Sequence, residues 1–325
     1  MSKSNVKAVS AIVVCYGYSE LLLETLDSIF MQDYPSIELI IAEDGSNRFQ
    51  KQLVQNYIEQ KSGPNIIDYK ILVSNVNRGT VKNINNALAS ATGDYIKIIG
   101  GDDVYSDPSV FSRQINVFNC KDYYLVVGNS LECDESLDIQ GEVGFGPLGV
   151  VSLTEDTQAL LKYICIEDAR VLSTQCICYK KRFFEKYGLF DESFMLIEDL
   201  PMAVKIAYKK VPFAYIDAPC VKHRGGTGVS TSAQAFDVHR LIYYKDLQKY
   251  YEKILMPLSD EIGKKLYLKI RMEVCRFRVK YCSTNNQIQK LMLILRYSWA
   301  LIGYIIINYK RAKRYMVSLM KGKRN

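Results

Sequence analysis

Two neighbouring carboxylates, Asp102 and Asp103, follow an apolar run that ends in two glycines, Tyr95-Ile-Lys-Ile-Ile-Gly-Gly-Asp-Asp103. The isoleucines are typical of a buried strand, and Gly100-Gly101 permits a tight turn after it. Adjacent carboxylates repel each other, and a hard cation that also binds an anionic ligand relieves this repulsion. The stretch therefore predicts a Mg²⁺ or Mn²⁺ ion that bridges to a diphosphate, although the same residues also suit an ordinary polar turn.

Other polar groups lie where chemistry could take place. Glu43-Asp44-Gly45-Ser46 follows another apolar run. Glu198-Asp199 precedes a helical pattern, and the positive end of a helix dipole favours ionised carboxylates. His223, one of two histidines, lies in a polar run over residues 221–230 that we expect to be a flexible loop. Its imidazole is either a third contact to the metal or the diphosphate from a closing loop, or an exposed loop histidine.

Alternating strand and helix patterns in the first hundred residues would position these groups. We expect strands over residues 9–16, 37–42 and 66–73 and from Tyr95 onward, with helices over residues 20–30, 48–61 and 80–91 between them. Near-continuous apolar strands separated by helices predict a mostly parallel, doubly wound α/β sheet with helices on both faces. Ligands bind beyond the carboxyl ends of the strands in such sheets, and the acidic residues fall there.

The pattern is looser after Asp103. We expect strands over residues 123–128, 171–179 and 212–217, helices over 154–165, 180–187 and 198 to about 208, and a mobile glycine-rich loop over 141–149. From about residue 233 onward the sequence predicts helices alone. We therefore expect two parts, a catalytic domain over residues 1–232 and a basic helical region over residues 233–325.

The composition indicates a globular protein with an uneven charge distribution. Of 325 residues, 48% are hydrophobic and 24% charged, and the net charge is +7. Residues 240–325 hold 20 Lys and Arg against 5 Asp and Glu, a charge of +15, which leaves −8 for residues 1–239. The nine cysteines are scattered, and no apolar leader precedes the first strand, so we expect a reduced, cytoplasmic protein.

An apolar segment in the basic region is a candidate membrane-binding element. Residues 291–308 are apolar apart from Arg296, Ser298 and Asn308, and four cations follow within residues 310–314. The length is at the lower limit for crossing a bilayer, and Arg296 would be costly at its centre. We expect a helix that lies on an anionic membrane surface, which would make the protein peripheral at the inner face of the cell membrane. A transmembrane helix and a helix packed on the catalytic domain are the alternatives.

Taken together, these motifs resemble the inverting family 2 glycosyltransferases of the GT-A fold. The resemblance covers roughly residues 9–232 and rests on five segments in the family's order: the first strand through Tyr16, Glu43-Asp44-Gly45-Ser46, Asn77-Arg-Gly79 with Asn85, Gly101-Asp102-Asp103, and Phe190-Asp-Glu192 with Glu198-Asp199. The sequence departs from the family where glycine replaces the first acid of the metal motif. It departs again at Ile84, where many members carry an arginine.

The resemblance implies a role for each candidate residue. The implied sites are Tyr16, Asp44, Arg78 and Asp102 for the donor nucleotide, Asp103 and His223 for Mg²⁺ or Mn²⁺, Glu198 for the acceptor side, and Asp199 as the general base. The donor would be a UDP- or dTDP-linked sugar, with Asp44 accepting a hydrogen bond from the base. The acceptor would be a glycan hydroxyl, carried on a lipid, in the synthesis of a surface polysaccharide such as O-antigen or capsule. Loop side chains such as Glu167, Asp168 and Arg170 would determine the sugar and the linkage.

Competing functions account for parts of the sequence. A dinucleotide-dependent enzyme would need Gly-x-Gly-x-x-Gly after the first strand, and Cys15-Tyr-Gly-Tyr-Ser lacks it. A non-catalytic module with a degenerate GT-A site, which binds nucleotide sugars or membranes, would account for the missing acid. We expect no nucleic-acid partner, because the body of the chain is acidic and carries no such motif.

Overall fold

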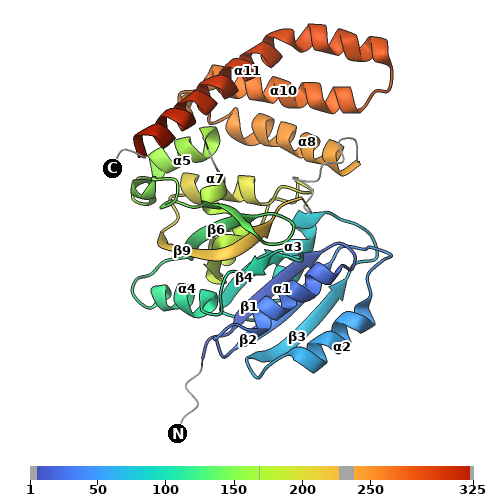
Figure 1. The fold of residues 1–325 in the computed structure, drawn as a ribbon, viewed down its shortest axis with the longest axis vertical. Helices are drawn as coiled ribbons and strands as arrows, with labels where there is room; N and C mark the ends of the chain where they lie inside the picture. Colours follow the sequence, from blue (N-terminus) through green and yellow to red (C-terminus); the bar gives the residue numbers. More distant parts are fainter. Residues whose placement is uncertain (1–5, 168, 227–237, 323–325) are drawn as a thin grey trace. The chain divides into compact units, whose positions relative to one another are not determined.

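The computed structural model describes residues 6–167, 169–226 and 238–322. The chain separates into two compact units, residues 1–233 and residues 234–325. The first unit contains a sheet with helices on its faces, and the second is made of helices (Figure 1). This architecture confirms the predicted α/β fold with a helical C-terminal region.

Four parallel strands form the first half of the sheet. They are β1 (Val9–Cys15), β2 (Ile37–Glu43), β3 (Ile66–Val73) and β4 (Tyr95–Gly100), in the order β3-β2-β1-β4. The connecting helices are α1 (Glu20–Phe30), α2 (Lys51–Lys61) and α3 (Thr80–Ser90). Every boundary lies within three residues of its prediction, because the apolar spacing of each element is unambiguous.

Helices cover both faces of these strands. On one face, Val9, Ala11 and Val13 of β1 pack in a core cluster with α1 and α2 residues such as Leu26 and Val54. On the other face, α3 contacts β1 and β2. Because both faces are covered, every residue of β2 is buried.

The second half of the sheet is mixed in direction. Beyond β4 it continues with β8 (Ile177–Lys180), β6 (Leu125–Cys133), β9 (Phe213–Arg224) and β5 (Val104–Tyr105), and β7 (Ile139–Val143) pairs with β6. The short strand β8 is antiparallel to both β4 and β6, whereas β6 and β9 are parallel. The nine-stranded sheet therefore combines a parallel half with a half that contains both parallel and antiparallel pairs.

The structure corrects the predictions in this second half. The helices are α4 (Val110–Phe118), α5 (Thr157–Ile166), α6 (Arg182–Tyr187) and α7 (Asp199–Tyr208). Helix α4 was not predicted. The strand predicted over residues 171–179 is wrong for its first part, because 3₁₀ turns occupy residues 169–172 and 174–176. The glycine-rich segment predicted as a loop over 141–149 begins inside β7.

The second unit is helical, as predicted. It contains α8 (Val238–Tyr250), a π-helical turn (Tyr251–Leu255), α9 (Ser259–Ile262), α10 (Lys265–Cys282) and α11 (Gln287–Gly322). Helices α10 and α11 fold back on each other as a hairpin (Figure 1). Tyr297 and Ala300 of α11 are buried in this hairpin. A Cβ atom at Gly303 would lie 3.0 Å from the Cδ1 atom of Ile270, which shows how closely the two helices approach.

Candidate active site

Asp103 lies in the turn after β4 and is almost completely buried, with 3% of its surface exposed. Its carboxylate accepts a hydrogen bond of 2.7 Å from the backbone N–H of Arg224 and lies 3.1 Å from the Nδ1 atom of His223. Burial raises the pKa of this carboxyl, although the contact with His223 opposes the rise. The same contact raises the pKa of His223 to about 9. A buried carboxylate and a partly exposed imidazole therefore form a complementary pair.

A strand holds His223 against Asp103. Val104 of β5 pairs with Lys222 of β9 in an antiparallel register, so the residue after Lys222 faces the turn that contains Asp103. The prediction of a flexible loop over 221–230 is thus wrong for its first part, because β9 continues to Arg224. The end of that predicted loop, from residue 227, lies outside the described residues.

Arg224 fixes this end of β9 through its side chain, which sequence reasoning missed. Its Nε atom donates to the backbone oxygen of Asp102 at 2.9 Å, and its guanidinium forms an ion pair with Glu24 of α1 at 2.5 Å. The guanidinium also donates to the backbone oxygen of Glu135 at 2.5 Å. One buried cation therefore joins α1, the turn at Asp102 and Asp103, and the segment after β6.

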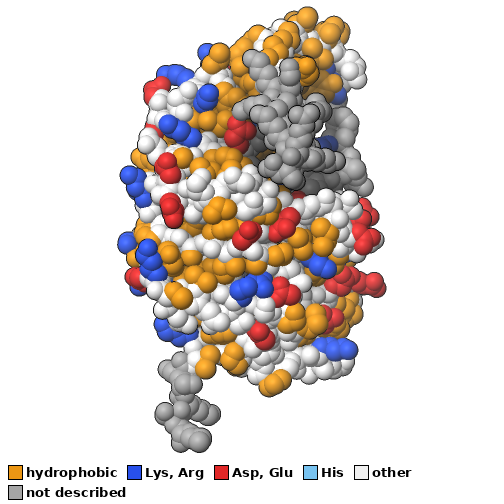
Figure 2. Space-filling view, turned by 60° about the vertical axis from the view of Figure 1, so that its left-hand side comes forward, with side chains coloured by type: hydrophobic (Ala, Val, Ile, Leu, Met, Phe, Trp, Pro, Cys, Tyr) orange, Lys and Arg blue, Asp and Glu red, His pale blue; other side chains and the backbone are white. Residues whose placement is uncertain are grey.

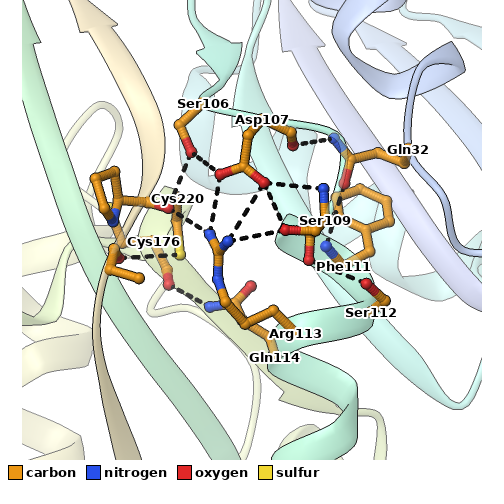
Figure 3. Close-up of polar contacts among 12 residues, drawn as sticks. Gln32, Ser106, Asp107, Ser109, Phe111, Ser112, Arg113, Gln114, Cys176 and Cys220 are labelled. Carbon is orange, nitrogen blue, oxygen red and sulfur yellow. Dashed lines mark hydrogen bonds and ion pairs between the residues drawn. The ribbon is translucent and has the colours of Figure 1, made fainter.

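A second ion pair holds β9 at Pro219, nearer the start of the strand (Figure 3). The guanidinium of Arg113 in α4 contacts the carboxylate of Asp107 at 3.2 Å and donates to the backbone oxygen of Pro219 in β9 at 2.6 Å. Burial raises the pKa of Asp107, but hydrogen bonds from Ser109 and Arg113 lower it more, to about 2. The unpredicted helix α4 thus holds the strand that carries His223.

Asp103 and His223 offer a carboxylate oxygen and an imidazole nitrogen, which would hold a divalent cation once the cation displaces the imidazole proton. Neighbouring ligand atoms around a cation with bonds of about 2.1 Å lie about 3.0 Å apart, close to the 3.1 Å between Asp103 and His223. Within the described parts of the chain, no group of three or more His, Cys, Asp and Glu side chains is placed to hold a metal ion. Mg²⁺ commonly uses one or two carboxylates and takes its other ligands from phosphates and water. The donor set therefore suits a metal that arrives with a diphosphate.

Asp44 organises the neighbouring loop. Its two carboxylate oxygens accept hydrogen bonds from the backbone N–H groups of Arg78 at 2.9 Å and Gly79 at 2.7 Å. Burial raises the pKa of Asp44, and these bonds oppose the rise. Glu43 binds the turn itself, through the N–H groups of Gly45 and Ser46 among others. The acids that follow β2 therefore hold together the two loops at the ends of β2 and β3.

The remaining donor-side candidates lie around this edge of the sheet. Tyr16 is half exposed at the end of β1, Arg78 is exposed, and Asp102 is partly buried. The carboxyl ends of β1, β2 and β4 bring Tyr16, Asp44 and Asp102 to one edge, as predicted from the parallel order.

The segment that leads into α7 is bound to α3. Asn85 of α3 donates from Nδ2 to the backbone oxygen of Phe190 at 2.9 Å and accepts from the N–H of Phe190 at 3.2 Å. Its Nδ2 atom also lies 3.1 Å from the Oε1 atom of Glu192. At the other end of the segment, Met195 accepts a hydrogen bond from the N–H of Val81 at 3.2 Å. Helix α3 therefore positions the start of α7.

Glu198 and Asp199 lie at the start of α7, partly exposed and closely surrounded by protein. Burial raises the pKa values of both carboxyls, and the charge of Asp199 raises that of Glu198 further. His223 lies near enough for its positive charge to lower the pKa of Asp199. Asp199 accepts a hydrogen bond from the N–H of Leu200 at 2.8 Å, and Glu198 occupies the N-cap position without a side-chain cap. Asp199 thus lies within electrostatic reach of the Asp103–His223 pair.

Glu132 and Arg170 extend this site at its rim. Glu132 of β6 is the register partner of His223, and the Nη1 atom of Arg170 lies 3.7 Å from its carboxylate. Glu132 had no signal in the sequence, because its place depends on the pairing of β6 with β9. Asp168 lies outside the described residues.

Comparison with known proteins assigns this arrangement to a family. Residues 10–188 match the model of glycosyl transferase family 2. The putative glycosyltransferase EpsE of Bacillus subtilis is 29% identical over 137 residues, which are 41% of this chain and 46% of that protein. The poly-beta-1,6-N-acetyl-D-glucosamine synthase of Staphylococcus epidermidis is 28% identical over 106 residues, 33% of this chain and 24% of that protein. The chain thus matches less than half the length of these relatives.

Solved structures show the same fold. The mannosyltransferase PcManGT from Pyrobaculum calidifontis, in complex with GDP-Man and Mn²⁺, aligns with a TM-score of 0.54 at 16% identity over 97% of this chain and 84% of that one. S. aureus TarS 1-349 in complex with UDP-GlcNAc aligns with a TM-score of 0.54 at 15% identity over 85% and 81%. The chain belongs to glycosyl transferase family 2 and has the fold of these enzymes.

Proposed function

We propose that this protein transfers a sugar from a nucleotide-diphosphate donor to a glycan hydroxyl with inversion at the anomeric carbon. We infer a UDP- or dTDP-linked donor and a hexose or deoxyhexose, and a lipid-linked acceptor in surface polysaccharide synthesis. The reaction would take place at the inner face of the cell membrane. One observation carries the proposal: the buried carboxylate of Asp103 contacts the partly exposed imidazole of His223, and this imidazole lies within electrostatic reach of Asp199.

The first requirement of the reaction is to stabilise negative charge on the departing diphosphate. Asp103 and His223 would hold Mg²⁺ or Mn²⁺, and the bound ion would supply positive charge to the diphosphate oxygens. Two structural neighbours were solved with nucleotide sugars, one of them with Mn²⁺ as well, which supports a nucleotide sugar and a divalent metal here. Tyr16, Asp44, Arg78 and Asp102 would bind the nucleotide around the same edge.

The second requirement is to remove a proton from the attacking hydroxyl. Asp199 would accept this proton at a carboxylate oxygen, because burial raises its pKa and makes it a stronger base than an exposed aspartate. Glu198 would contact the acceptor on the same side. Direct attack on the side opposite the diphosphate inverts the anomeric centre and needs no covalent enzyme intermediate. Arg170 and Glu132, at the rim, would contact the sugars that distinguish one acceptor from another.

Asp199→Asn tests this assignment. We expect the variant to bind UDP or dTDP like the wild type in calorimetric titration and to lose sugar transfer by about 10²- to 10⁴-fold, the usual contribution of a general base. Asp260→Asn is the matched control. The carboxylate of Asp260 is exposed, and its ion pair with Lys265, at 3.3 Å, lies on the surface.

A panel of nucleotide sugars would identify the donor. Transfer from one UDP- or dTDP-linked sugar, with inversion seen by NMR of the product, is the expected result. A wild-type protein that binds nucleotide and transfers no sugar from any donor would instead be a non-catalytic module. Full turnover by Asp199→Asn would exclude Asp199 as the base.

A further inference from the structure

The second unit carries an exposed apolar stripe on α11. Six residues at spacings of three and four recur on one face of the helix: Leu291, Leu295, Trp299, Ile302, Ile306 and Tyr309. Each keeps between 46% and 68% of its surface exposed. The stripe is about 27 Å long, since an α-helix rises about 1.5 Å per residue. Figure 2 shows hydrophobic side chains gathered on the surface of the second unit, around the hairpin of α10 and α11.

The opposite face of α11 is already occupied. Tyr297 and Ala300 are buried against α10, and Gly303 permits close contact with Ile270. Arg271 and Arg278 of α10 place their guanidinium groups 5.7 and 5.6 Å from the ring centre of Tyr304. The α10–α11 hairpin is therefore packed on one side only, and the stripe faces away from that packing.

This packing weighs against insertion across a bilayer. The segment Gln287–Tyr309 is long and apolar enough to cross a membrane by length and composition, with only 11% of its apolar window buried. Insertion would either break the contacts with α10 or carry Arg271 and Arg278 into hydrocarbon, where charged side chains are strongly disfavoured. A helix that lies in the interface keeps the hairpin intact.

The positive charge of residues 287–325 favours an anionic partner for the stripe. Residues 287–325 contain nine Lys and Arg and no Asp or Glu. A second copy of the chain would bring the same cations together across a symmetric interface, and like charges destabilise such a contact. An anionic lipid surface attracts each cation and accepts the apolar stripe between its headgroups.

We propose that the stripe of α11 docks flat on an anionic lipid surface, with the α10–α11 hairpin intact. The docking would hold the site near lipid-linked acceptors, and this purpose is the one point that rests on the proposed function. Its chemistry follows from the second unit alone. The exposed ring of Trp299 would lie at headgroup level, where tryptophan is favoured.

Trp299 is the only tryptophan of the chain and reports its own surroundings. With full-length protein, vesicles that contain phosphatidylglycerol should shift its emission to shorter wavelength, and high salt should reverse the shift. Vesicles of pure phosphatidylcholine should give a much smaller shift. An equal shift with both vesicles, or none with either, would overturn the proposal.

Substitutions within the stripe separate docking from folding. Ile302→Glu and Leu295→Glu should each weaken co-sedimentation with anionic vesicles by about tenfold or more, since each replaces an exposed aliphatic group that docking would bury with a negative charge that the anionic lipid repels. Ile139→Glu on β7 is the matched control, because Ile139 is 58% exposed and Ile302 is 57% exposed. Vesicle binding that survives both substitutions in the stripe would overturn the proposal.

Two further measurements distinguish other occupants. Alkaline carbonate should release the protein from membranes, and retention would indicate a spanning helix. Light scattering should show that the wild-type protein is a monomer. A wild-type dimer that Ile302→Glu dissociates, in a protein that does not bind vesicles, would indicate that a second copy of the chain covers the stripe. Normal transfer to a water-soluble acceptor without vesicle binding would contradict this inference alone, whereas vesicle binding without transfer from any donor would contradict the proposed function alone.

Discussion

The side-chain amide of Asn85 forms two hydrogen bonds with the backbone of Phe190, a residue 105 positions further along the chain. Through this pair α3 holds the segment that ends in Glu198 and Asp199. The family motifs to which the two residues belong are thus parts of a single structural unit.

Asn85→Asp should loosen this unit. The new carboxylate still accepts from the N–H of Phe190, but it cannot donate to Phe190 and it repels Glu192. We expect a loss of about 1–3 kcal/mol in the free energy of unfolding and a lower kcat, because an unpaired buried polar group carries that cost. Chemical denaturation and turnover measure the two effects. Asn86→Asp is the control. Asn86 is the exposed neighbour of Asn85, so this substitution should change the free energy of unfolding by less than about 0.5 kcal/mol. Equal effects of both substitutions would contradict the role of Asn85.

Asp103→Asn should remove the effect of the metal ion. Asparagine keeps the shape and the acceptor for the N–H of Arg224 and loses the charge that a cation needs. Turnover should fall by about 10²- to 10³-fold, which is typical when one stabilising contact to the departing group is lost. Titration with UDP in Mn²⁺ should show binding that a chelator abolishes in the wild type, and much weaker binding in the variant. Wild-type binding that is indifferent to chelator would remove the metal role of Asp103.

Gly79→Ala should disrupt the loop that Asp44 holds. Gly79 has a φ of +89°, and an added Cβ atom would lie 2.4 Å from the Cγ atom and 2.5 Å from the backbone oxygen of Met195. Strain of this kind costs about 1–3 kcal/mol before the steric contact is relieved. The midpoint temperature of thermal unfolding and the affinity for UDP should both fall. Gly141→Ala has open space around its Cβ position and should leave both unchanged.

Glu38 predicts how stability depends on acid. It is 1% exposed on β2, and its carboxylate lies 2.5 Å from the Nζ atom of Lys70. Burial raises the pKa of Glu38, but hydrogen bonds from Lys70, Ser10 and Thr92 lower it more, to about 2. The stabilisation is therefore present above about pH 4.5 and is lost as the pH falls through 2, with a size of about 3 kcal/mol.

Glu38→Gln should be less stable than the wild type at neutral pH, and the difference should shrink as the pH falls below about 4.5. Unfolding by urea at a series of pH values measures this. Glu155→Gln serves as the control, because that side chain is exposed. A difference that stays constant with pH would contradict the role of the Lys70 pair.

The pH dependence of transfer tests the pair Glu198 and Asp199. The base must be ionised, and burial raises the pKa of Asp199, so kcat should rise with pH through a range above that of an ordinary aspartate. Burial and the charge of Asp199 raise the pKa of Glu198 to about 8, so Glu198 is still protonated while Asp199 ionises. Glu198→Gln should therefore leave the first rise of kcat in place and remove any second transition near pH 8, and a second transition that persists in this variant would contradict its assignment to Glu198.

Much of the site could be predicted from sequence because its residues follow strands. Asp44, Asp102 and Asp103 come directly after β2 and β4, and a parallel order places them on one edge. Helix α4 also had a clear signal, since Phe111, Ile115 and Phe118 are buried at helical spacing, and it was overlooked. The turns before β8 were mistaken for a strand because short apolar runs fit either structure.

Other parts depend on contacts that no local pattern contains. Arg224 looked like a loop residue beside glycines, and its four contacts come from α1, the turn after β4 and the segment after β6. The role of His223 as a strand residue depends on the pairing of β9 with β5 and β6. Only the folded chain shows that the guanidinium of Arg224 and the end of β9 position Asp103 and His223, the candidate metal ligands.

The order of strands also determines when the site can form during synthesis. Strands β1 to β4 all lie within the first hundred residues, whereas Asp103 meets its partner His223 only after 120 further residues have been made. Since domains fold as the chain emerges from the ribosome, the parallel half can assemble first and wait for β9. Nascent chains that stop before β9 would therefore hold a folded parallel sheet in which Asp103 still lacks its contacts with His223 and Arg224.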